Sequence, residues 1–184
     1  MILAVDVHYT EKSACVAGVS YADWAATEVL GEFVCDVDEI ADYQPGEFYK
    51  RELPCILHLL QQHRLQPEVI VIDGYVYLDG VAKPGLGKHL YDALDGKSTI
   101  IGVAKNPFHG IAQQTQLLRG KSSKPLYITS TGAVEHAKSG VAQMQGPDRL
   151  PLLLKRVDRL CRDAILCRDK PDRVLTPEAN SSQS

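Results

Sequence analysis

Two continuous apolar runs constrain the fold of this chain more than any other feature. They are EVIVID at 68–73 and STIIGVA at 98–104. Neither run alternates with polar residues, which is typical of parallel strands covered on both faces. A glycine-rich loop at 74–87 and the helical pattern LGKHLYDAL at 86–94 separate them. Strand, helix and strand in this order predict the α/β class, with a central sheet flanked by helices.

The N-terminal third predicts further strands in this sheet. ILAVDV is typical of a short buried strand, which we expect to end at Asp6 and His8. CVAGVSYA at 15–22 and ATEVLGEFVCDV at 26–37 are rich in strand-forming residues and are separated by a short polar break. Together they indicate an antiparallel meander, so the predicted sheet is mixed.

The remaining elements follow from periodicity and turn residues. Residues 47–65 have helical spacing, in which Pro54 fits only near the first turn or at a kink. We expect a polar loop with a short helix at 105–124, a strand at 125–130, and helices at 133–145 and 149–166. The chain is therefore predicted to form a single domain over 1–168, followed by a flexible tail at 169–184.

Composition excludes several classes of protein. No apolar run approaches the roughly 20 residues that a membrane span needs. No basic segment precedes the apolar start MILAVDV, so we expect a cytoplasmic protein with no membrane contact. The five cysteines include no CxxC pair, which argues against a disulfide framework or a structural zinc site. The net charge of −3 means that any nucleic-acid site must be a local basic patch.

Two acids would meet at one edge of the sheet if the strands that carry them are neighbours, as the topology allows. Asp6 follows the first apolar strand, and Asp73 ends EVIVID. Ligands of such sheets bind beyond the carboxyl ends of the strands. Two ionised acids in close, buried contact would protonate or bind a cation, and Mg²⁺ or Mn²⁺ suits oxygen ligands. Glu52, on the predicted helix over the sheet, offers a third oxygen donor. The alternative is that each acid is an ordinary turn or cap residue.

Six motifs resemble, in order, those of the endonuclease V family, the deoxyinosine 3′ endonucleases. They are VDVHY, DYQPGEFYKRELP, VIDGY, PGLGKHL, IIGVAK and the late RLP, and they span roughly residues 1–155. The resemblance implies a ribonuclease H-like fold. It also implies a monomeric divalent-metal-dependent endonuclease that binds DNA or RNA with a deaminated purine and hydrolyses a phosphodiester 3′ of the lesion.

The resemblance assigns roles to individual positions. Asp6, Glu52 and Asp73 match the metal-binding acids of the family, with Mg²⁺ or Mn²⁺ as the implied cofactor. Lys105, the last residue of IIGVAK, matches the lysine of a Gly-Val-Ala-Lys motif. A lysine there would stabilise charge on a phosphate, whereas the alternative is a solvated strand end.

The same resemblance implies contacts to nucleic acid. DYQPG falls on the family's wedge, so that the ring of Tyr43, next to Pro45 and Gly46, would replace lost base stacking and help to extrude the base. The alternative is an exposed loop aromatic. The other predicted substrate-binding residues are Arg51, Gly74 and Lys83. Candidates for a track along the phosphate backbone are Lys50, Arg51, Lys83, Lys88, Lys121 and Lys124.

The chain also departs from the family pattern. Family members continue as Asp-Gly-His-Gly, whereas this chain has DGYVYLDGVAKPG, with Tyr75 and Asp79 near the expected positions of polar residues. A late Gly-His is Gly132-Ala133, and His136 is either its substitute or a surface histidine. Two alternatives therefore stay open. One is a nucleic-acid-binding or interaction module without full catalysis, and the other is a metal-dependent hydrolase of another phosphate substrate.

Overall fold

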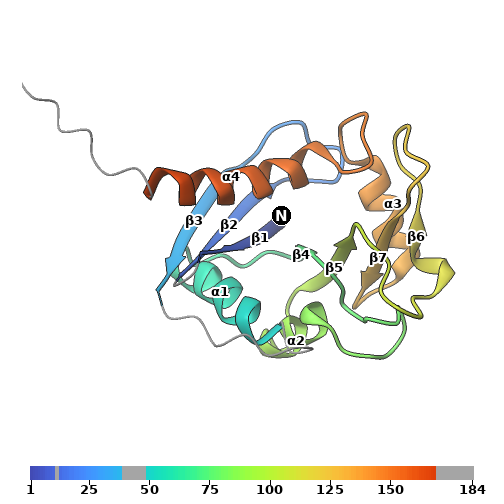
Figure 1. The fold of residues 1–184 in the computed structure, drawn as a ribbon, viewed down its shortest axis with the longest axis horizontal. Coiled ribbons are helices and arrows are strands. Elements are labelled where there is room, and N and C mark those ends of the chain that lie inside the picture. Colours follow the sequence, from blue (N-terminus) through green and yellow to red (C-terminus); the bar gives the residue numbers. More distant parts are fainter. Residues whose placement is uncertain (11–12, 39–48, 169–184) are drawn as a thin grey trace, which may run out of the picture.

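A computed structural model describes residues 1–10, 13–38 and 49–168. In this part of the chain seven strands form one sheet with the order β3-β2-β1-β4-β5-β7-β6 (Figure 1). The strands are β1 Ile2–Tyr9, β2 Ala14–Tyr21, β3 Gly31–Val37, β4 Val69–Asp73, β5 Thr99–Ala104, β6 Gln116–Leu117 and β7 Leu126–Ser130. The helices are α1 Tyr49–Gln62, α2 Leu86–Ala93, α3 Val134–Gln143 and α4 Leu152–Arg168, with a 3₁₀ turn at Gln113–Thr115. The predicted α/β class with a mixed sheet is confirmed.

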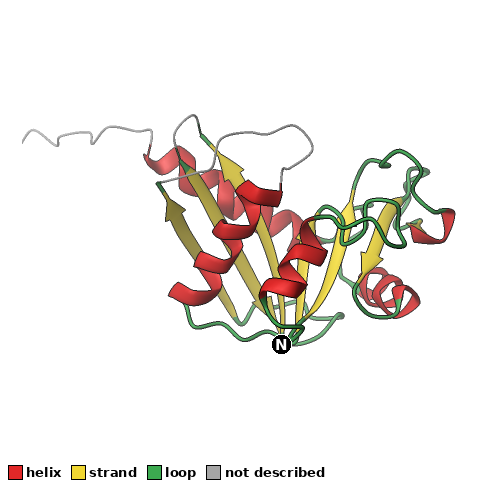
Figure 2. Cartoon of the chain, turned by 90° about the horizontal axis from the view of Figure 1, so that it is seen from below, coloured by secondary structure: helices red, strands yellow, loops and turns green. Residues whose placement is uncertain are grey.

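The central strands are parallel, as their apolar runs predict. β1 pairs with β4, and β4 pairs with β5, in parallel, whereas the flanking pairs are antiparallel. The chain crosses from one parallel strand to the next through α1 or α2, because such a connection must return to the starting edge. Figure 2 shows the strands fanning out from the edge at which the N-terminus lies. The carboxyl ends of the parallel strands β1, β4 and β5 therefore lie at the opposite edge.

The two faces of the sheet bury separate cores. Alternate residues of a strand point to opposite faces, and β1 follows this rule strictly. Ile2 and Ala4 pack in the core beneath α4, whereas Leu3, Val5 and Val7 pack in the core beneath α1 and α2. In Figure 1, α4 crosses one face of the sheet, and α1 and α2 lie on the other side. Even-numbered residues of β1 therefore face α4.

Several predicted boundaries are wrong, and tertiary pairing explains them. β1 continues past the predicted end at Asp6 and His8 to Tyr9, because it stays paired with β2 up to Tyr9↔Ala14 after leaving β4. The predicted strand at 26–37 is a strand only from Gly31, since residues 22–30 form turns and bends. The described helix α1 begins at Tyr49 and ends at Gln62, inside the predicted range 47–65. The predicted tail at 169–184 lies outside the described residues.

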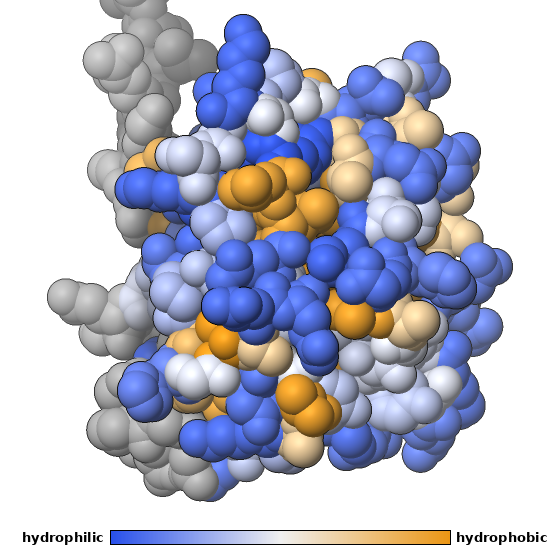
Figure 3. Space-filling model, turned by 90° about the vertical axis from the view of Figure 1, so that its right-hand side faces the viewer, coloured by the Kyte–Doolittle hydropathy of each residue, from blue (hydrophilic) through white to orange (hydrophobic). Residues whose placement is uncertain are grey.

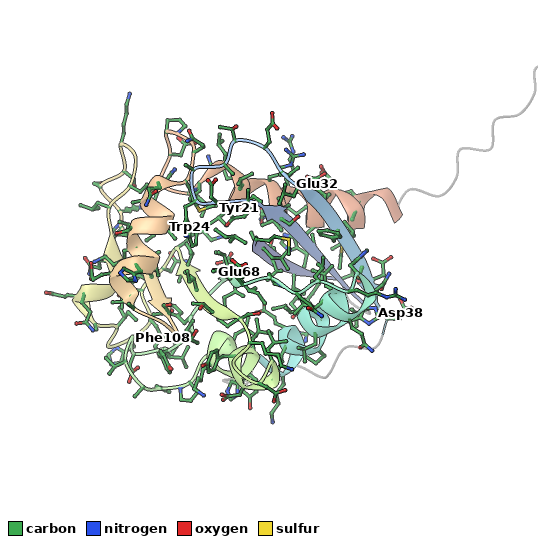
Figure 4. All side chains as sticks on the ribbon, turned by 180° about the vertical axis from the view of Figure 1, so that it is seen from behind. Tyr21, Trp24, Glu32, Asp38, Glu68 and Phe108 are labelled. Carbon is green, nitrogen blue, oxygen red and sulfur yellow. The ribbon has the colours of Figure 1, made fainter. Side chains whose placement is uncertain are left out.

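The outer end of the sheet carries little continuous apolar surface. Seen from the side of β6, β7 and α3, the molecule is mainly hydrophilic, with separate apolar patches (Figure 3). Trp24 lies beside α3, and Phe108 lies in the loop that follows β5 (Figure 4). Among the described residues, no helix has the length and apolar character that crossing a membrane requires.

Gly102 in β5 lets the chain leaving β4 pass very close to the sheet. A Cβ atom at Gly102 would lie 2.5 Å from the carbonyl oxygen of Gly74 and 2.7 Å from Thr129 Oγ1. We expect Gly102→Ala to lower the free energy of unfolding by about 1–3 kcal/mol, because backbone and side chain would both have to shift. Urea denaturation measures this change. Gly132→Ala is the matched control, since its Cβ would meet its nearest atom at 3.5 Å. Equal losses from both substitutions would contradict this account.

Candidate metal centre at the carboxyl edge of the sheet

Asp6 and Asp73 lie side by side where β1 and β4 separate. The parallel register runs from Ile2↔Val69 to Val5↔Ile72, and the next residues along the two strands are Asp6 and Asp73. Asp73 is the last residue of β4. By the alternation of the strands, both side chains belong to the face covered by α4. The condition on which the sequence placed both acids at one edge, that these two strands are neighbours, is met.

Glu52 approaches the same acids from the opposite face of the sheet. It lies in the first turn of α1, half-buried, and lines a small cavity together with Asp6 and Asp73. The other lining residues are apolar: Val5, Val7, Ile56, Ile72 and Leu86. Burial raises the pKa of Glu52 to about 8, and the negative charges of Asp6 and Asp73 contribute to this rise. The carboxyl is therefore costly to ionise without a compensating cation.

Asp6 is perturbed for the same reasons. Burial, followed by the charges of Asp73 and Asp158, raises the pKa of Asp6 to about 7. The backbone N–H of Val7 and the ammonium of Lys105 act in the opposite direction without cancelling the rise. A carboxyl pushed this far from its ordinary value, in a cleft with other acids, is typical of functional sites.

Lys105 is the cation that the protein itself supplies. It follows the last residue of β5, and its Nζ lies 2.7 Å from Asp73 Oδ2. Burial would lower the pKa of Lys105, but the hydrogen bond to Asp73 and the nearby carboxylates outweigh it and raise that pKa. Lys105 is thus held as a positive charge beside the acids.

Two residues that sequence reasoning missed complete the cluster: Asp158 on α4 and His8 on β1. One ligating atom each of Asp6, His8 and Asp158 lies within 4.8 Å of the other two. The inward-facing side of α4 includes Leu154, Val157 and Cys161 at helical spacing, and Asp158 lies on this side. An acid on the apolar face of an amphipathic helix was the signal available in the sequence.

A second cavity shows how these groups are arranged. Its charged lining residues are Asp6, Asp73, Lys105 and Asp158, and its apolar lining comes from strands β1, β4 and β5 and from α4 with its preceding loop. Asp6 and Asp73 line both cavities. Asp6 and Asp73 therefore lie between two groups of charged residues. Glu52 lies on the side of α1, and Asp158 and Lys105 lie on the side of α4.

The predicted substrate-binding residues have mixed positions. The guanidinium of Arg51 lies 4.5 Å from the ring centre of Tyr9, close to the cluster. Gly74 adopts φ +133°, and no atom would lie within 4 Å of a Cβ there, so its backbone is open to a ligand. Lys83 Nζ lies over the ring of Phe108 at 5.3 Å. Tyr43, Pro45 and Gly46 lie outside the described residues.

The residues that depart from the family pattern shape the nearby loops. The hydroxyl of Tyr75 donates to the carbonyl of Asn106 at 2.6 Å and accepts from the N–H of Phe108 at 3.1 Å. Asp79 Oδ1 accepts the backbone N–H groups of residues 81–83, which lowers the pKa of its carboxyl to about 2. Both side chains therefore hold loop backbone rather than joining the acid cluster.

His136 is exposed on α3, which packs on β7 at the outer end of the sheet. It is not part of the group formed by Asp6, His8 and Asp158. The surface-histidine interpretation therefore fits its position. Among the described residues the histidine that adjoins the acids is His8.

The donors fit a hard divalent cation. Carboxylate oxygens are the ligands that Mg²⁺ and Mn²⁺ prefer, and Mn²⁺ also accepts imidazole. Burial, followed by the neighbouring acidic charges, raises the pKa of Asp6 and of Glu52, so a cation beside them would favour their ionised forms. His8 Nε2 is shielded from solvent and makes no hydrogen bond within the described part of the chain. A bound cation would stabilise the ionised carboxylates of Asp6 and Glu52, and it would give His8 Nε2 a partner.

The mixed sheet and the acids gathered at its carboxyl edge define a ribonuclease H-like protein. Residues 1–145 match the model of the endonuclease V family. The chain belongs to this family of nucleases.

Relatives of known family agree with this assignment. The chain is 28% identical over 169 residues to endonuclease V of Alkalilimnicola ehrlichii, covering 80% of this chain and 71% of the relative. It is 29% identical over 188 residues to endonuclease V of Nocardia farcinica, covering 89% and 80%. The crystal structure of endonuclease V from Streptomyces avermitilis superposes with a TM-score of 0.76 at 26% identity, covering 92% of this chain and 82% of that one.

Proposed function

We propose that this chain is a divalent-metal-dependent endonuclease that hydrolyses a phosphodiester bond 3′ of a deaminated purine in DNA or RNA. The observation that carries the proposal is the convergence of Asp6, Glu52 and Asp73, with Lys105 in contact with Asp73, at the carboxyl edge of the sheet. Three distant stretches of chain bring these acids together there, with Asp6 and Glu52 half-buried and Asp73 more exposed. A protein with no use for a cation gains nothing from facing carboxylates, because their repulsion destabilises the fold.

The residues of the site have different roles in the proposed reaction. Asp6, Glu52 and Asp73, joined by Asp158, hold the cation. A bound Mg²⁺ or Mn²⁺ supplies a water of lowered pKa and neutralises charge on the phosphate. Lys105 stabilises negative charge on a phosphate oxygen, because its ammonium already lies among the acids, 2.7 Å from Asp73.

Substrate contacts extend from this centre. The open backbone at Gly74 and the cations of Arg51 and Lys83 would contact the nucleotide next to the scissile bond. The wedge assigned to Tyr43, Pro45 and Gly46 would press into the duplex beside the lesion. We assign all of these roles to one monomeric domain, residues 1–168, since the described elements share one sheet and its covering helices.

The choice of inosine is supported by a solved relative. Endonuclease V of Ciona intestinalis, which shares the fold at 17% identity and a TM-score of 0.76, was crystallised with a 24mer DNA containing an inosine followed by a ribo-adenosine. The relation of this chain to the family therefore makes inosine the first substrate to test.

Cleavage of a labelled oligonucleotide tests the proposal. With Mg²⁺ or Mn²⁺, a strand carrying one inosine is expected to be cut at one site 3′ of it, whereas a matched strand with guanine stays intact. Single- and double-stranded DNA and RNA versions define the substrate class. Binding of the inosine strand with no cleavage by micromolar protein would favour the non-catalytic module instead. Equal cleavage of the guanine strand would remove the lesion specificity.

A further inference from the structure

His8 lies where a nitrogen donor can join the oxygen donors of the cluster. Strand alternation places Asp6 and His8 on the same face of β1, toward α4. β1 reaches His8 because it continues along β2, pairing His8 with Cys15, after it has left β4. His8 Nε2 lies 3.6 Å from Asp158 Oδ1.

The packing of α4 on β1 and β2 holds Asp158 near His8. Cys161, one turn after Asp158, is fully buried and donates from its Sγ to the carbonyl oxygen of Cys15 at 2.9 Å. Cys15 is the register partner of His8. The side of α4 that carries Asp158 is therefore held against the strand segment that carries His8.

The nitrogen of His8 has no other described role. Nε2 is shielded from solvent and accepts or donates no hydrogen bond within the described residues, although the side chain as a whole is 32% exposed. An unpaired polar atom at such a position costs stability unless a partner is present. Asp158 is already engaged by Arg162, whose Nη2 lies 2.9 Å from the same Oδ1.

We propose that His8 is a nitrogen ligand of the divalent cation, together with Asp6 and Asp158, and that it makes this site prefer Mn²⁺ over Mg²⁺. The inference rests on the proposed metal-dependent function and specifies its cofactor. Imidazole raises affinity for transition metals, whereas Mg²⁺ retains a strong preference for oxygen and water. The competing explanation is a simple ion pair between His8 and Asp158.

Electron paramagnetic resonance of bound Mn²⁺ separates the two explanations. The metal-free full chain is titrated with Mn²⁺, and pulsed spectra are searched for the coupling of a directly bound imidazole ¹⁴N. We expect this coupling in the natural protein and its loss in His8→Gln. His136→Ala is the matched control, because His136 is exposed on α3, and it is expected to keep the coupling.

Affinity gives a second readout that does not depend on turnover. Calorimetric titration of His8→Gln is expected to show Mn²⁺ binding weakened at least about 10-fold, with Mg²⁺ binding changed less than about 3-fold. Circular dichroism verifies that the variant is folded. Mn²⁺ that binds the natural protein without ¹⁴N coupling, or equal losses for both ions, would overturn the role of His8 and leave the nuclease proposal standing. Retained ¹⁴N coupling without cleavage of the inosine strand would support the role of His8 and contradict the nuclease proposal.

Discussion

Asp6→Asn is expected to lower the rate of inosine-strand cleavage by at least about 10³-fold at saturating Mg²⁺. Asp6 lines both cavities, as Asp73 does, and it also belongs to the group with His8 and Asp158. The amide keeps the size of the side chain but removes the charge that holds a cation. Losing one preorganised electrostatic contact typically costs 10²–10³ in rate, and losing a metal ligand costs at least as much. Single-turnover cleavage of the labelled strand measures the effect.

Asp95→Asn is the matched control for this substitution. It makes the same chemical change at an exposed residue with φ 53°, a conformation that asparagine tolerates. We expect its cleavage rate to stay within about 2-fold of the natural protein. Binding of the inosine strand by Asp6→Asn, measured by fluorescence anisotropy in Ca²⁺, should change little. If Asp6→Asn cleaves normally, the acid edge is not the catalytic centre.

Local pattern was sufficient to predict the centre of the sheet. EVIVID and STIIGVA have no polar alternation, and a strand buried on both faces is the simplest structure that tolerates this. The rule that ligand sites lie at the carboxyl ends of parallel strands indicated the edge at which Asp6 and Asp73 lie, but whether their strands are neighbours stayed open. Glu52 could be added as a third oxygen donor because its helix was expected to pack over the sheet.

The missing members of the cluster depend on tertiary packing. Asp158 is more than 150 residues from Asp6, and its approach is decided by how α4 sits on the sheet. His8 was expected at the end of the strand and was given no ligand role, although alternation would have placed it on the same face as Asp6. The register of β1 against β2, which carries the strand to Tyr9, is a long-range property that no local window contains.

The loops were the least predictable part of the candidate site. Tyr75 and Asp79 stand near positions where the family has a histidine or asparagine and a second histidine. In the structure both bind main-chain groups, in the loops at 106–108 and 81–83. Which backbone group a polar side chain satisfies is decided by loop geometry, and composition carries little information about it.

The metal-free protein is expected to lose stability as pH rises from about 5 to 8. The folded-state pKa values of Asp6 and Glu52 are raised from 3.8 to about 7 and from 4.5 to about 8. Between these limits the folded state binds more protons than the unfolded state, so the free energy of unfolding falls with pH. Each pKa unit is worth about 1.4 kcal/mol, but water screens half-exposed groups, so we expect a loss of about 3 kcal/mol in total.

Divalent ions should reverse this loss, because a cation competes with protons for the same carboxylates. Thermal unfolding in the presence of a chelator is expected to give a melting temperature about 6–12 °C lower at pH 8 than at pH 5. Saturating Mn²⁺ should restore most of the lost melting temperature at pH 8 and should have little effect on the melting temperature at pH 5. The double variant Asp6→Asn/Glu52→Gln isolates the cause, since other titrating groups remain in it. If the melting temperature of the double variant falls with pH as steeply as that of the natural protein, the ionisation of Asp6 and Glu52 is not the cause of the loss of stability.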